Sequence, residues 1–392
     1  MIVRRRPARF ALVAALPLLA VAACGDNAQE PRAAPQRADP AATAASQLRQ
    51  SIETASYRPP VAATADAQTS GESSSGGVAT SGEPKAADGA GGGQTSSGPG
   101  GAVSGALPAD ARPDPVMARA QILLDRTRFS PGIVDGLGGE NTRQAIAAFE
   151  EAHDLEVDGE LDAEVFQRLA SGDSRKVLTD YTITEADTAG PFIGKLPEDI
   201  ADMGELETVG YADAREALAE KFHMSEALLD ALNPGVDFAR AGQTIVVAAP
   251  GPNELQGEVA RIVIDKAENS LRAFDADGTL LAFYPATIGS GEMPSPSGSH
   301  TVRAIAPEPN YTYDPSRVSY GEGGDKVVVP PGPNNPVGSV WIDLSRDTYG
   351  IHGTPEPAEI GKTASSGCVR LTNWDAEQLA GAVKPGVEVR FT

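Results

Sequence analysis

Tyr349-Gly350-Ile351-His352-Gly353-Thr354 stands near the C-terminus and is followed by Ser365-Ser366-Gly367-Cys368-Val369-Arg370-Leu371, with sixteen residues from the histidine to the cysteine. The two stretches supply a base and a nucleophile. A free thiol is mostly protonated at neutral pH, so a nucleophilic cysteine needs a neighbouring imidazole or another positive feature. We therefore expect His352 to activate Cys368, and we expect the N–H groups of Gly367 and Cys368 to form an oxyanion hole.

The same two stretches resemble the signature of the L,D-transpeptidase catalytic domain, in which His-Gly-Thr is followed by Ser-x-Gly-Cys-aliphatic-Arg. Three upstream segments extend the resemblance: Thr287-Ile288-Gly289, Pro294-Ser295-Pro296-Ser297-Gly298 and Asn335-Pro336-Val337-Gly338. The resemblance covers about residues 258–392. It implies a cysteine acyltransferase that forms a thioester with peptidoglycan stem peptides. Many members of the family carry a second histidine where this chain has Ser366, so the assistance that this histidine gives is left open.

Other residues of these stretches are expected to support the reaction. Ser365 is expected to hold the cysteine loop or the histidine by hydrogen bonding, and it is counted with Gly367 among the catalytic residues. Arg370, Ser366 and Gly353 are predicted to contact the substrate. For Arg370, a role in orienting the motif and a structural ion pair stay open as alternatives. The scattered cysteines and histidines lack the spacing of a zinc site, so we expect no metal and no cofactor.

The N-terminus has the pattern of an export signal. Four arginines lie among residues 2–9 and precede an apolar run that is too short to span a bilayer and ends in Val21-Ala22-Ala23-Cys24. This pattern predicts a secretory signal over residues 1–23. The small residues before Cys24 resemble the lipobox of bacterial lipoproteins, which implies cleavage before Cys24 and acylation of that residue; Gly25 then favours the outer membrane. The alternative is an ordinary signal peptide with an incidental cysteine.

Residues 24–112 are dominated by Ala, Gly, Ser, Pro, Thr and Gln. Such a segment cannot bury enough apolar surface to offset the entropy of ordering it, so we expect a disordered linker. The net charge of −22 argues against a nucleic-acid partner, which would require a basic surface. With Cys24 lipidated, the exported protein would keep one thiol, which suggests a chemical use for Cys368 in an oxidising compartment.

Three short helices are predicted over residues 113–172. Apolar residues recur at helical spacing after Pro113, a second helix is expected to begin at the capping pair Asn141-Thr142, and a third is expected after Asp158-Gly159. Over about 55 residues these turns and helices resemble the three-helix peptidoglycan-binding domain. That resemblance implies peptidoglycan as a partner, and a structural module without a ligand is the alternative.

Residues 178–250 are predicted to fold in the order strand, helix, helix, strand. The strands are expected at residues 181–184 and 243–247, and the helices at 212–221 and 225–232. This order resembles a degenerate LysM glycan-binding module, with an insertion after the first strand that is longer than that family usually has. Glycan binding and a spacer that orients the catalytic domain stay open as alternatives.

From residue 258 onward, short alternating strands indicate a predominantly β domain. Strands are expected at residues 260–265, 270–274 and 280–284, with a hairpin turn at Asp277-Gly278. The whole chain is therefore predicted to be a multidomain α+β protein. Its C-terminal domain, residues 258–392, carries the catalytic residues.

The expected function is that of an L,D-transpeptidase that forms 3–3 cross-links between peptide stems or attaches a protein to the wall. A second hypothesis delivers the same thioester to water, which would make the protein an L,D-carboxypeptidase or a cross-link hydrolase. A third treats the chain as a non-catalytic lipoprotein that anchors the wall. The expected location is exported, held in the membrane by a lipid on Cys24, and facing the periplasm.

Overall fold

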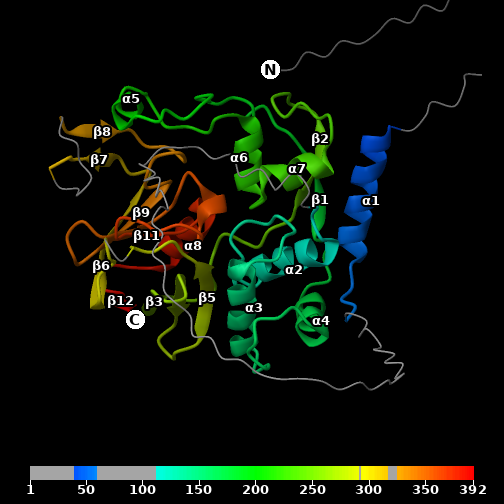
Figure 1. The fold of residues 1–392 in the computed structure, drawn as a ribbon, viewed down its shortest axis with the longest axis horizontal. Helices are drawn as coiled ribbons and strands as arrows, with labels where there is room; N and C mark the ends of the chain where they lie inside the picture. Colours follow the sequence, from blue (N-terminus) through cyan, green and yellow to red (C-terminus); the bar gives the residue numbers. More distant parts are fainter. Residues whose placement is uncertain (1–38, 60–111, 291–292, 317–324) are drawn as a thin grey trace, which may run out of the picture. The chain divides into compact units, whose positions relative to one another are not determined.

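Residues 39–59, 112–290, 293–316 and 325–392 are described by the computed structural model (Figure 1). The predicted signal peptide, the predicted lipidation site Cys24 and most of the predicted linker lie outside these residues. Across the described ranges, no helix has both the length and the apolar character needed to cross a bilayer.

A bundle of three helices follows the predicted linker, as the sequence predicts. The helices are α2 (Pro115–Arg126), α3 (Glu140–Ala152) and α4 (Ala163–Gly172). Asp114 and Asp162 cap α2 and α4 by accepting hydrogen bonds from N–H groups of the first turn. The prediction that Asn141-Thr142 caps the second helix is wrong, because Gly139 holds the N-cap position. The side chains of the pair bond elsewhere, and Asn141 Nδ2 donates to the carbonyl oxygen of Ile360 (2.8 Å).

An additional helix, α1 (Pro40–Thr54), lies in the segment predicted to be a disordered linker. Ala45 and Ile52 are buried, and Ile52 belongs to the same hydrophobic core as the three-helix bundle. The carboxylate of Glu53 accepts a hydrogen bond from the N–H of Leu178 (2.8 Å). The helix was not predicted because its apolar face is narrow and has few large side chains, so the segment has the composition of a linker.

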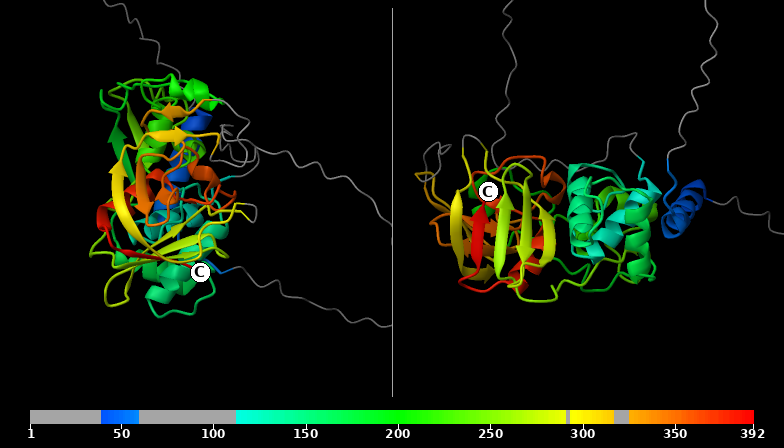
Figure 2. Two further views of the ribbon diagram at one scale, coloured as in Figure 1. Left: turned by 90° about the vertical axis from the view of Figure 1, so that its left-hand side faces the viewer. Right: turned by 90° about the horizontal axis from the view of Figure 1, so that it is seen from below.

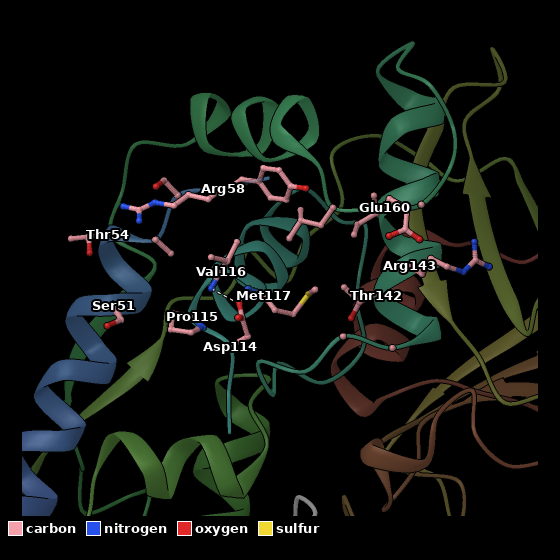
Figure 3. A pocket seen from close by; sticks show the side chains of 18 residues that line it. Ser51, Thr54, Arg58, Asp114, Pro115, Val116, Met117, Thr142, Arg143 and Glu160 are labelled. Atoms are coloured by element: carbon pink, nitrogen blue, oxygen red, sulfur yellow. Dashed lines mark hydrogen bonds between the residues drawn. The ribbon is translucent and has the colours of Figure 1, made fainter. Parts of the chain in front are cut away.

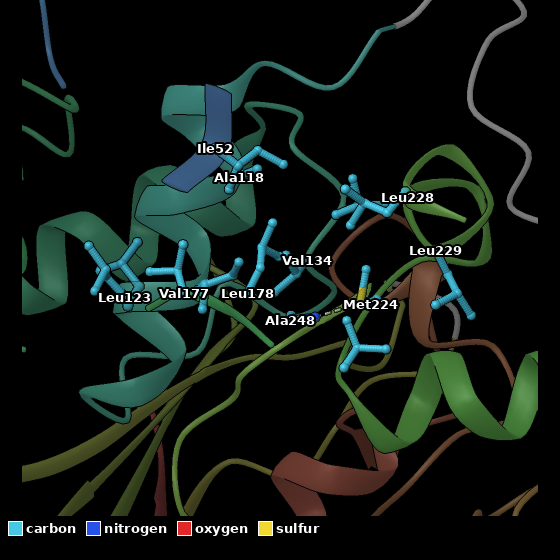
Figure 4. Packing of buried hydrophobic residues seen from close by; sticks show 14 of the residues in the cluster. Ile52, Ala118, Leu123, Val134, Val177, Leu178, Met224, Leu228, Leu229 and Ala248 are labelled. Atoms are coloured by element: carbon cyan, nitrogen blue, oxygen red, sulfur yellow. Dashed lines mark hydrogen bonds between the residues drawn. The ribbon is translucent and has the colours of Figure 1, made fainter. Parts of the chain in front are cut away.

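The middle module has the predicted order of strand, helix, helix, strand. Its elements are β1 (Leu178–Thr182), α5 (Ile200–Gly204), α6 (Ala214–Lys221), α7 (Glu226–Leu232) and β2 (Thr244–Ala248). β1 and β2 pair antiparallel, and α5 is a short additional helix within the long insertion. One hydrophobic cluster joins α1, the bundle and the middle module, and it includes Ile52, Leu123, Val134, Met224 and Leu229 (Figure 4). The two predicted modules therefore share a core.

The C-terminal domain is built around an eight-stranded mixed sheet with the order β11-β10-β9-β6-β12-β3-β4-β5 (Figure 2). Its strands are β3 (Arg261–Asp265), β4 (Ser270–Phe274), β5 (Leu280–Pro285), β6 (Gly298–Pro307), β9 (Val340–Leu344), β10 (Gly350–His352), β11 (Val369–Arg370) and β12 (Glu388–Phe391). β10 runs parallel to β11, β12 runs parallel to β3, and the other neighbours are antiparallel. Helix α8 (Asn373–Ala382) joins the sheet in a second hydrophobic cluster that includes Ile342, Ile351 and Leu379. The predicted mostly-β domain is confirmed.

The helical bundle covers the edge of the sheet at β5. The N–H of Ser130 donates to the carbonyl oxygen of Phe283 (2.9 Å), and the N–H of Phe283 donates to the carbonyl oxygen of Arg128 (3.0 Å). These bonds form a short parallel bridge between Phe129 and Phe283. An exposed edge strand invites pairing with other chains, so the bundle protects this edge.

A separate two-stranded arm extends from the C-terminal domain. It consists of β7 (Tyr311–Tyr313) and β8 (Val327–Val329), which pair antiparallel. Val329 packs with Met203 and Val209 of the middle module in a small third cluster. The long insertion of the middle module thus has a packing partner in the C-terminal domain.

Candidate active site

The register of β10 and β11 decides where the predicted base points. Ile351 pairs with Val369, and both side chains are fully buried in the core of the C-terminal domain. Successive side chains of a strand point to opposite faces, so His352 and Arg370, which also pair, project from the other face.

Cys368 immediately precedes β11 and lies beside the first residue of β10. Its Sγ donates to the carbonyl oxygen of Thr348 (3.7 Å), and the N–H of Gly350 lies close enough to act on the pKa of the thiol. Gly350 is two residues before His352 on the same strand, which is one full pleat. The fold therefore brings the predicted nucleophile and the predicted base to the same pair of strands.

His352 is held as a neutral imidazole. Its side chain is buried and Nδ1 bonds to the carbonyl oxygen of Gly353 (2.7 Å), so Nδ1 carries the proton and Nε2 keeps a lone pair. The ring stacks on Trp341, with centroids 5.4 Å apart and an interplanar angle of 17°. Burial, and secondly the charge of Arg370, lower the pKa of His352 to about 3.

Cys368 is a thiol at rest. Its side chain is half-buried, and burial raises the pKa of the thiol above its ordinary value, although the Gly350 N–H and the charge of Arg370 act in the opposite direction. The expectation that a neighbouring imidazole favours the thiolate does not describe this resting state, because desolvation penalises both ionised forms.

The cysteine loop is tied together by Ser365. Its Oγ donates to the carbonyl oxygen of Cys368 and accepts from the N–H of Gly367 (3.1 Å), in line with the loop-holding role expected for it. Because the Gly367 N–H is occupied by this bond, it would have to leave Ser365 before it could join an oxyanion hole. Gly367 has φ +112°, and a Cβ there would lie 2.8 Å from Cε1 of Tyr349, so the position requires glycine.

Ser295 was not singled out from the sequence, although it lies in the upstream proline turn. Its Oγ donates to the carbonyl oxygen of Gly367 (2.7 Å) and accepts from the N–H of Gly289 (3.0 Å). A Cβ at Gly289 would collide with the backbone of Ser295 and Met293. The hydroxyl therefore fastens the turn to the cysteine loop.

The three predicted substrate contacts have different surroundings. Arg370 is half-buried, and none of the ion pairs found among the described residues involves it, so the structural ion pair left open from the sequence is not found there. Ser366 is exposed and stands two residues before Cys368. Gly353 is buried, its carbonyl oxygen holds His352, and a Cβ there would collide with Oδ1 of Asn373. These contacts give Gly353 a packing role, and its predicted contact with the substrate stays a prediction.

Asn373 was also missed from the sequence. Its Oδ1 accepts hydrogen bonds from the N–H groups of Ser339 (3.2 Å) and Thr354 (3.1 Å), and its Nδ2 donates to Glu220 and to the carbonyl oxygen of Pro333 (3.1 Å each). A buried amide in a helical turn leaves no signal in the sequence, because only the fold supplies its four partners.

Two other histidines lie in the shared core. His223 is buried, bonds through Nδ1 to Asp125 (3.0 Å), and stacks on Trp374 at 4.9 Å and 9°. His153 bonds through Nδ1 to the carbonyl oxygen of Phe149 (2.7 Å). Both side chains pack against aromatic rings, His223 against Trp374 and His153 against Phe149. Within the part of the chain that the structure describes, no group of three or more His, Cys, Asp or Glu side chains is arranged to hold a metal ion.

Two family models match the chain. The model of the L,D-transpeptidase catalytic domain, YkuD, matches residues 259–390, and a model described as a "putative peptidoglycan binding domain" matches residues 113–169. The first match contains His352 and Cys368, and the second contains α2, α3 and the greater part of α4.

Several curated proteins are similar to the chain. A "putative L,D-transpeptidase YkuD" of Bacillus licheniformis is 30% identical over 179 residues, which cover 45% of this chain and 92% of the relative. The Bacillus subtilis protein of the same name is 29% identical over 183 residues, covering 46% and 94%. A "probable L,D-transpeptidase YcfS" of Escherichia coli is 33% identical over 187 residues, covering 45% and 58%.

Solved structures were also matched. L,D-transpeptidase 3 from Mycobacterium tuberculosis, in complex with a faropenem-derived adduct, is 17% identical, with a TM-score of 0.29 and coverage of 39% of this chain and 74% of that one. The catalytic domain of an E. faecium L,D-transpeptidase acylated by ertapenem is 19% identical, with a TM-score of 0.28 and coverage of 35% and 99%.

Proposed function

The chain belongs to the L,D-transpeptidase family and is an enzyme of that activity, and we propose that it acts through a thioester on Cys368 with His352 as general base. The match of residues 113–169 supports peptidoglycan as its partner. The observation that carries the proposal is that a half-buried thiol lies beside Gly350, and that Gly350 is two residues before an imidazole whose Nε2 is unprotonated.

The proposed reaction uses both neutral groups. Nε2 of His352 takes the thiol proton as Sγ attacks the carbonyl between the third residue of a stem tetrapeptide and its terminal D-Ala. The C–N bond breaks, D-Ala leaves with the proton from the imidazolium, and a thioester remains. An amine of a neighbouring stem then attacks the thioester, gives its proton to His352, and releases the thiol with a 3–3 cross-link formed.

The acceptor and the substrate contacts are part of the same proposal. An amine of a protein in place of the stem amine would attach that protein to the wall, and water would make the enzyme a carboxypeptidase or hydrolase. Arg370 is proposed to bind a stem carboxylate, since it is a cation near the thiol with no ion pair among the described side chains. Ser366 is proposed to contact the substrate, because it is exposed two residues before Cys368.

The thioester is tested by mass spectrometry. Incubation of the full chain with a carbapenem, whose strained carbonyl acylates thiols, is expected to add one drug-derived acyl group at Cys368. Cys368→Ala should give no adduct, and His352→Ala should form it at least about a hundredfold more slowly. Folded wild-type protein without an adduct would contradict the proposal. Incubation with tetrapeptide muropeptides then identifies the acceptor, because dimers indicate a stem amine and tripeptides alone indicate water.

A pocket on the helical bundle supports peptidoglycan binding there (Figure 3). It has a volume of about 810 Å³ and lies where the residues after α1 meet the first turns of α2 and α3. Its lining combines apolar side chains with hydroxyl and guanidinium groups, as a sugar-peptide ligand requires, and includes Tyr57, Arg58, Met117, Thr142, Arg143 and Ile146. We assign a peptidoglycan fragment to this pocket.

Pelleting with purified wall sacculi tests the pocket. Tyr57→Ala and Arg58→Ala are each expected to lower the fraction of protein that pellets, while acylation of Cys368 is retained. Arg168→Ala is the matched control, because this guanidinium is exposed on α4 outside the lining. Equal pelleting of all three variants and the wild type would remove the assignment.

The matched domains imply an exported, cell-wall-associated protein. We propose further that Cys24 is the lipid anchor, in the outer membrane, and that residues 1–23 are its signal and residues 24–112 mainly its tether. The proposed LysM-like role of residues 178–250 rests on the strand, helix, helix, strand order and the antiparallel pairing of its strands. Loss of labelling by a radioactive fatty acid in Cys24→Ser, with labelling of the wild type, would support the anchor.

A further inference from the structure

The side-chain amide of Asn373 bridges two segments of the active-site sheet. Its Oδ1 accepts from the N–H of Ser339, which precedes β9, and from the N–H of Thr354, which is two residues after His352. Asn373 is buried, and it is fixed as the first residue of α8 behind the N-cap Thr372. An amide oxygen has two lone pairs, so both are used.

Two glycines make room for this amide. A Cβ on either Gly338 or Gly353 would collide with Oδ1 of Asn373. Gly353 is also the residue whose carbonyl oxygen holds Nδ1 of His352. The backbone that orients the imidazole is therefore pressed directly against the amide.

The other side of the amide faces the middle module. Nδ2 donates to Oε2 of Glu220 on α6 and to the carbonyl oxygen of Pro333. Glu220 is 7% exposed and lies 153 positions from Asn373 in the sequence. These two acceptors fix which way the amide is turned, because a reversed amide would place its oxygen against them and its N–H groups against Ser339 and Thr354.

We propose that Asn373 is a positioning residue for His352, and that Glu220 of the middle module holds Asn373 in its working orientation. The middle module is then part of the catalytic unit, in addition to any glycan binding or spacing role. The inference rests on the proposed role of His352 as the base. It acts through a short path of contacts, from Glu220 to the amide, from the amide to Thr354, and from the adjoining Gly353 carbonyl to the imidazole.

The rate of acylation of Cys368 by a carbapenem tests this path in the full chain. A misplacement of a base by about 1 Å can cost on the order of a hundredfold in rate, so Asn373→Ala is expected to slow the covalent step by about ten- to a hundredfold, with little change in the drug concentration at half-maximal rate. Glu220→Leu is expected to slow it by about three- to tenfold, and Glu220→Gln, whose amide oxygen can still accept from Asn373, should restore a rate near that of the wild type.

Leu379→Ala separates positioning from general destabilisation. Leu379 is fully buried on the same helix, α8, and has no polar contact with the histidine loop. The Leu379→Ala variant should lower the melting temperature at least as much as Asn373→Ala does, while its acylation rate stays that of the wild type. An unchanged rate in Asn373→Ala, or an equal loss in Leu379→Ala, would overturn the inference, whereas a wild type that is never acylated would remove the proposed function itself.

The pH dependence gives a readout that needs no disruptive variant. Burial raises the pKa of Glu220 to about 8, with Glu216 and Glu377 adding to the rise and the bond from Asn373 opposing it; Tyr211 is the remaining titratable neighbour. Glu220 is therefore uncharged at neutral pH and ionises above about 8, which places a buried negative charge beside Glu216 and Glu377 and strains the contacts around the amide. The acylation rate of Glu220→Gln divided by that of the wild type should stay constant below pH 7 and increase above pH 8. A ratio that does not change with pH would count against the role of Glu220.

Discussion

At the scale of single residues, the uncharged state of the proposed base and nucleophile sets the expected pH dependence of the reaction. Burial holds the pKa of His352 at about 3 and the pKa of Cys368 above its ordinary value. The neutral pair is thus the resting form from about pH 4 to the alkaline range. In this respect the site differs from one that stores an imidazolium and a thiolate.

Acylation of Cys368 is expected to show no inflection between pH 5 and 7.5. The reason is that His352 is already unprotonated above pH 3 and Cys368 is still protonated across this window. Single-turnover acylation followed by mass spectrometry over this pH series provides the measurement. A sigmoidal rise with a midpoint between 6 and 7 would show that the imidazole titrates near its ordinary value, against this expectation.

Gly367→Ala is expected to lower the free energy of unfolding by at least about 1–2 kcal/mol, because L-residues avoid positive φ angles. The added methyl group would also press on Tyr349 and displace the cysteine loop, so acylation should slow as well. Gly381→Ala on α8 is the matched control: a Cβ there meets no atom, and alanine in a helix should stabilise by about 0.5–1 kcal/mol. Urea denaturation of both variants makes the comparison, and equal effects would refute the strain argument.

At the scale of elements, periodic apolar patterns predicted the positions of helices and strands well, whereas isolated polar residues did not predict their contacts. The strands at residues 270–274 and 280–284 and the helix at residues 225–232 were placed to within one residue or so of β4, β5 and α7. Their alternation or capping residues determine them locally. α1 was missed because its apolar stripe is narrow, and α5 was missed because it has only five residues. Both helices pack against segments that are distant in the sequence.

The candidate site shows the same division. The proximity of Cys368, which precedes β11, to His352 on β10 could be predicted, because both residues stand in recognisable motifs, while their catalytic roles stay predictions. Asn373 and Ser295 could not, because an asparagine or serine acquires such a role only from the backbone groups that the fold brings to it. The resting thiol was also not predictable, since it depends on how deeply Cys368 is buried.

Ile52→Ala tests whether α1 belongs to the folded core. Ile52 is fully buried in the shared cluster, so the variant is expected to lower the free energy of unfolding by about 2–4 kcal/mol, or to raise hydrogen exchange across α1 if the helix detaches by itself. Arg49→Ala is the control, because its ion pair with Asp180 is exposed and should contribute less than about 1 kcal/mol. Unchanged stability and exchange in Ile52→Ala would mean that α1 is not docked in solution.

At the scale of the whole molecule, buried acids between the modules link stability to pH. Burial raises the pKa of Asp375 to about 7 and that of Glu220 to about 8, from ordinary values of 3.8 and 4.5. The folded state therefore binds these protons more tightly than the unfolded state. The pKa of His223 is also raised, although burial opposes the rise, by its bonded partner Asp125.

The melting temperature is accordingly expected to fall as the pH rises from 5 to 8.5. For both acids the unfolded chain releases its proton at the ordinary pKa and the folded chain only near 7 to 8, so stability decreases with pH between those values; His223 adds stability that is lost above its raised pKa. Differential scanning fluorimetry across this range measures the slope. Asp375→Asn should reduce it, and a melting temperature that increases toward pH 8.5 would contradict the assigned shifts.

The bridge between Phe129 and β5 limits how this enzyme can be truncated. A fragment that starts at residue 258 would lose the segment that pairs with its edge strand β5. Backbone N–H and carbonyl groups of β5 would then be unpaired, next to an exposed phenyl ring at Phe283. Two such fragments would then be able to associate by pairing their exposed β5 strands. Aggregation of the truncated protein would therefore be caused by the truncation and would not be a property of the native enzyme.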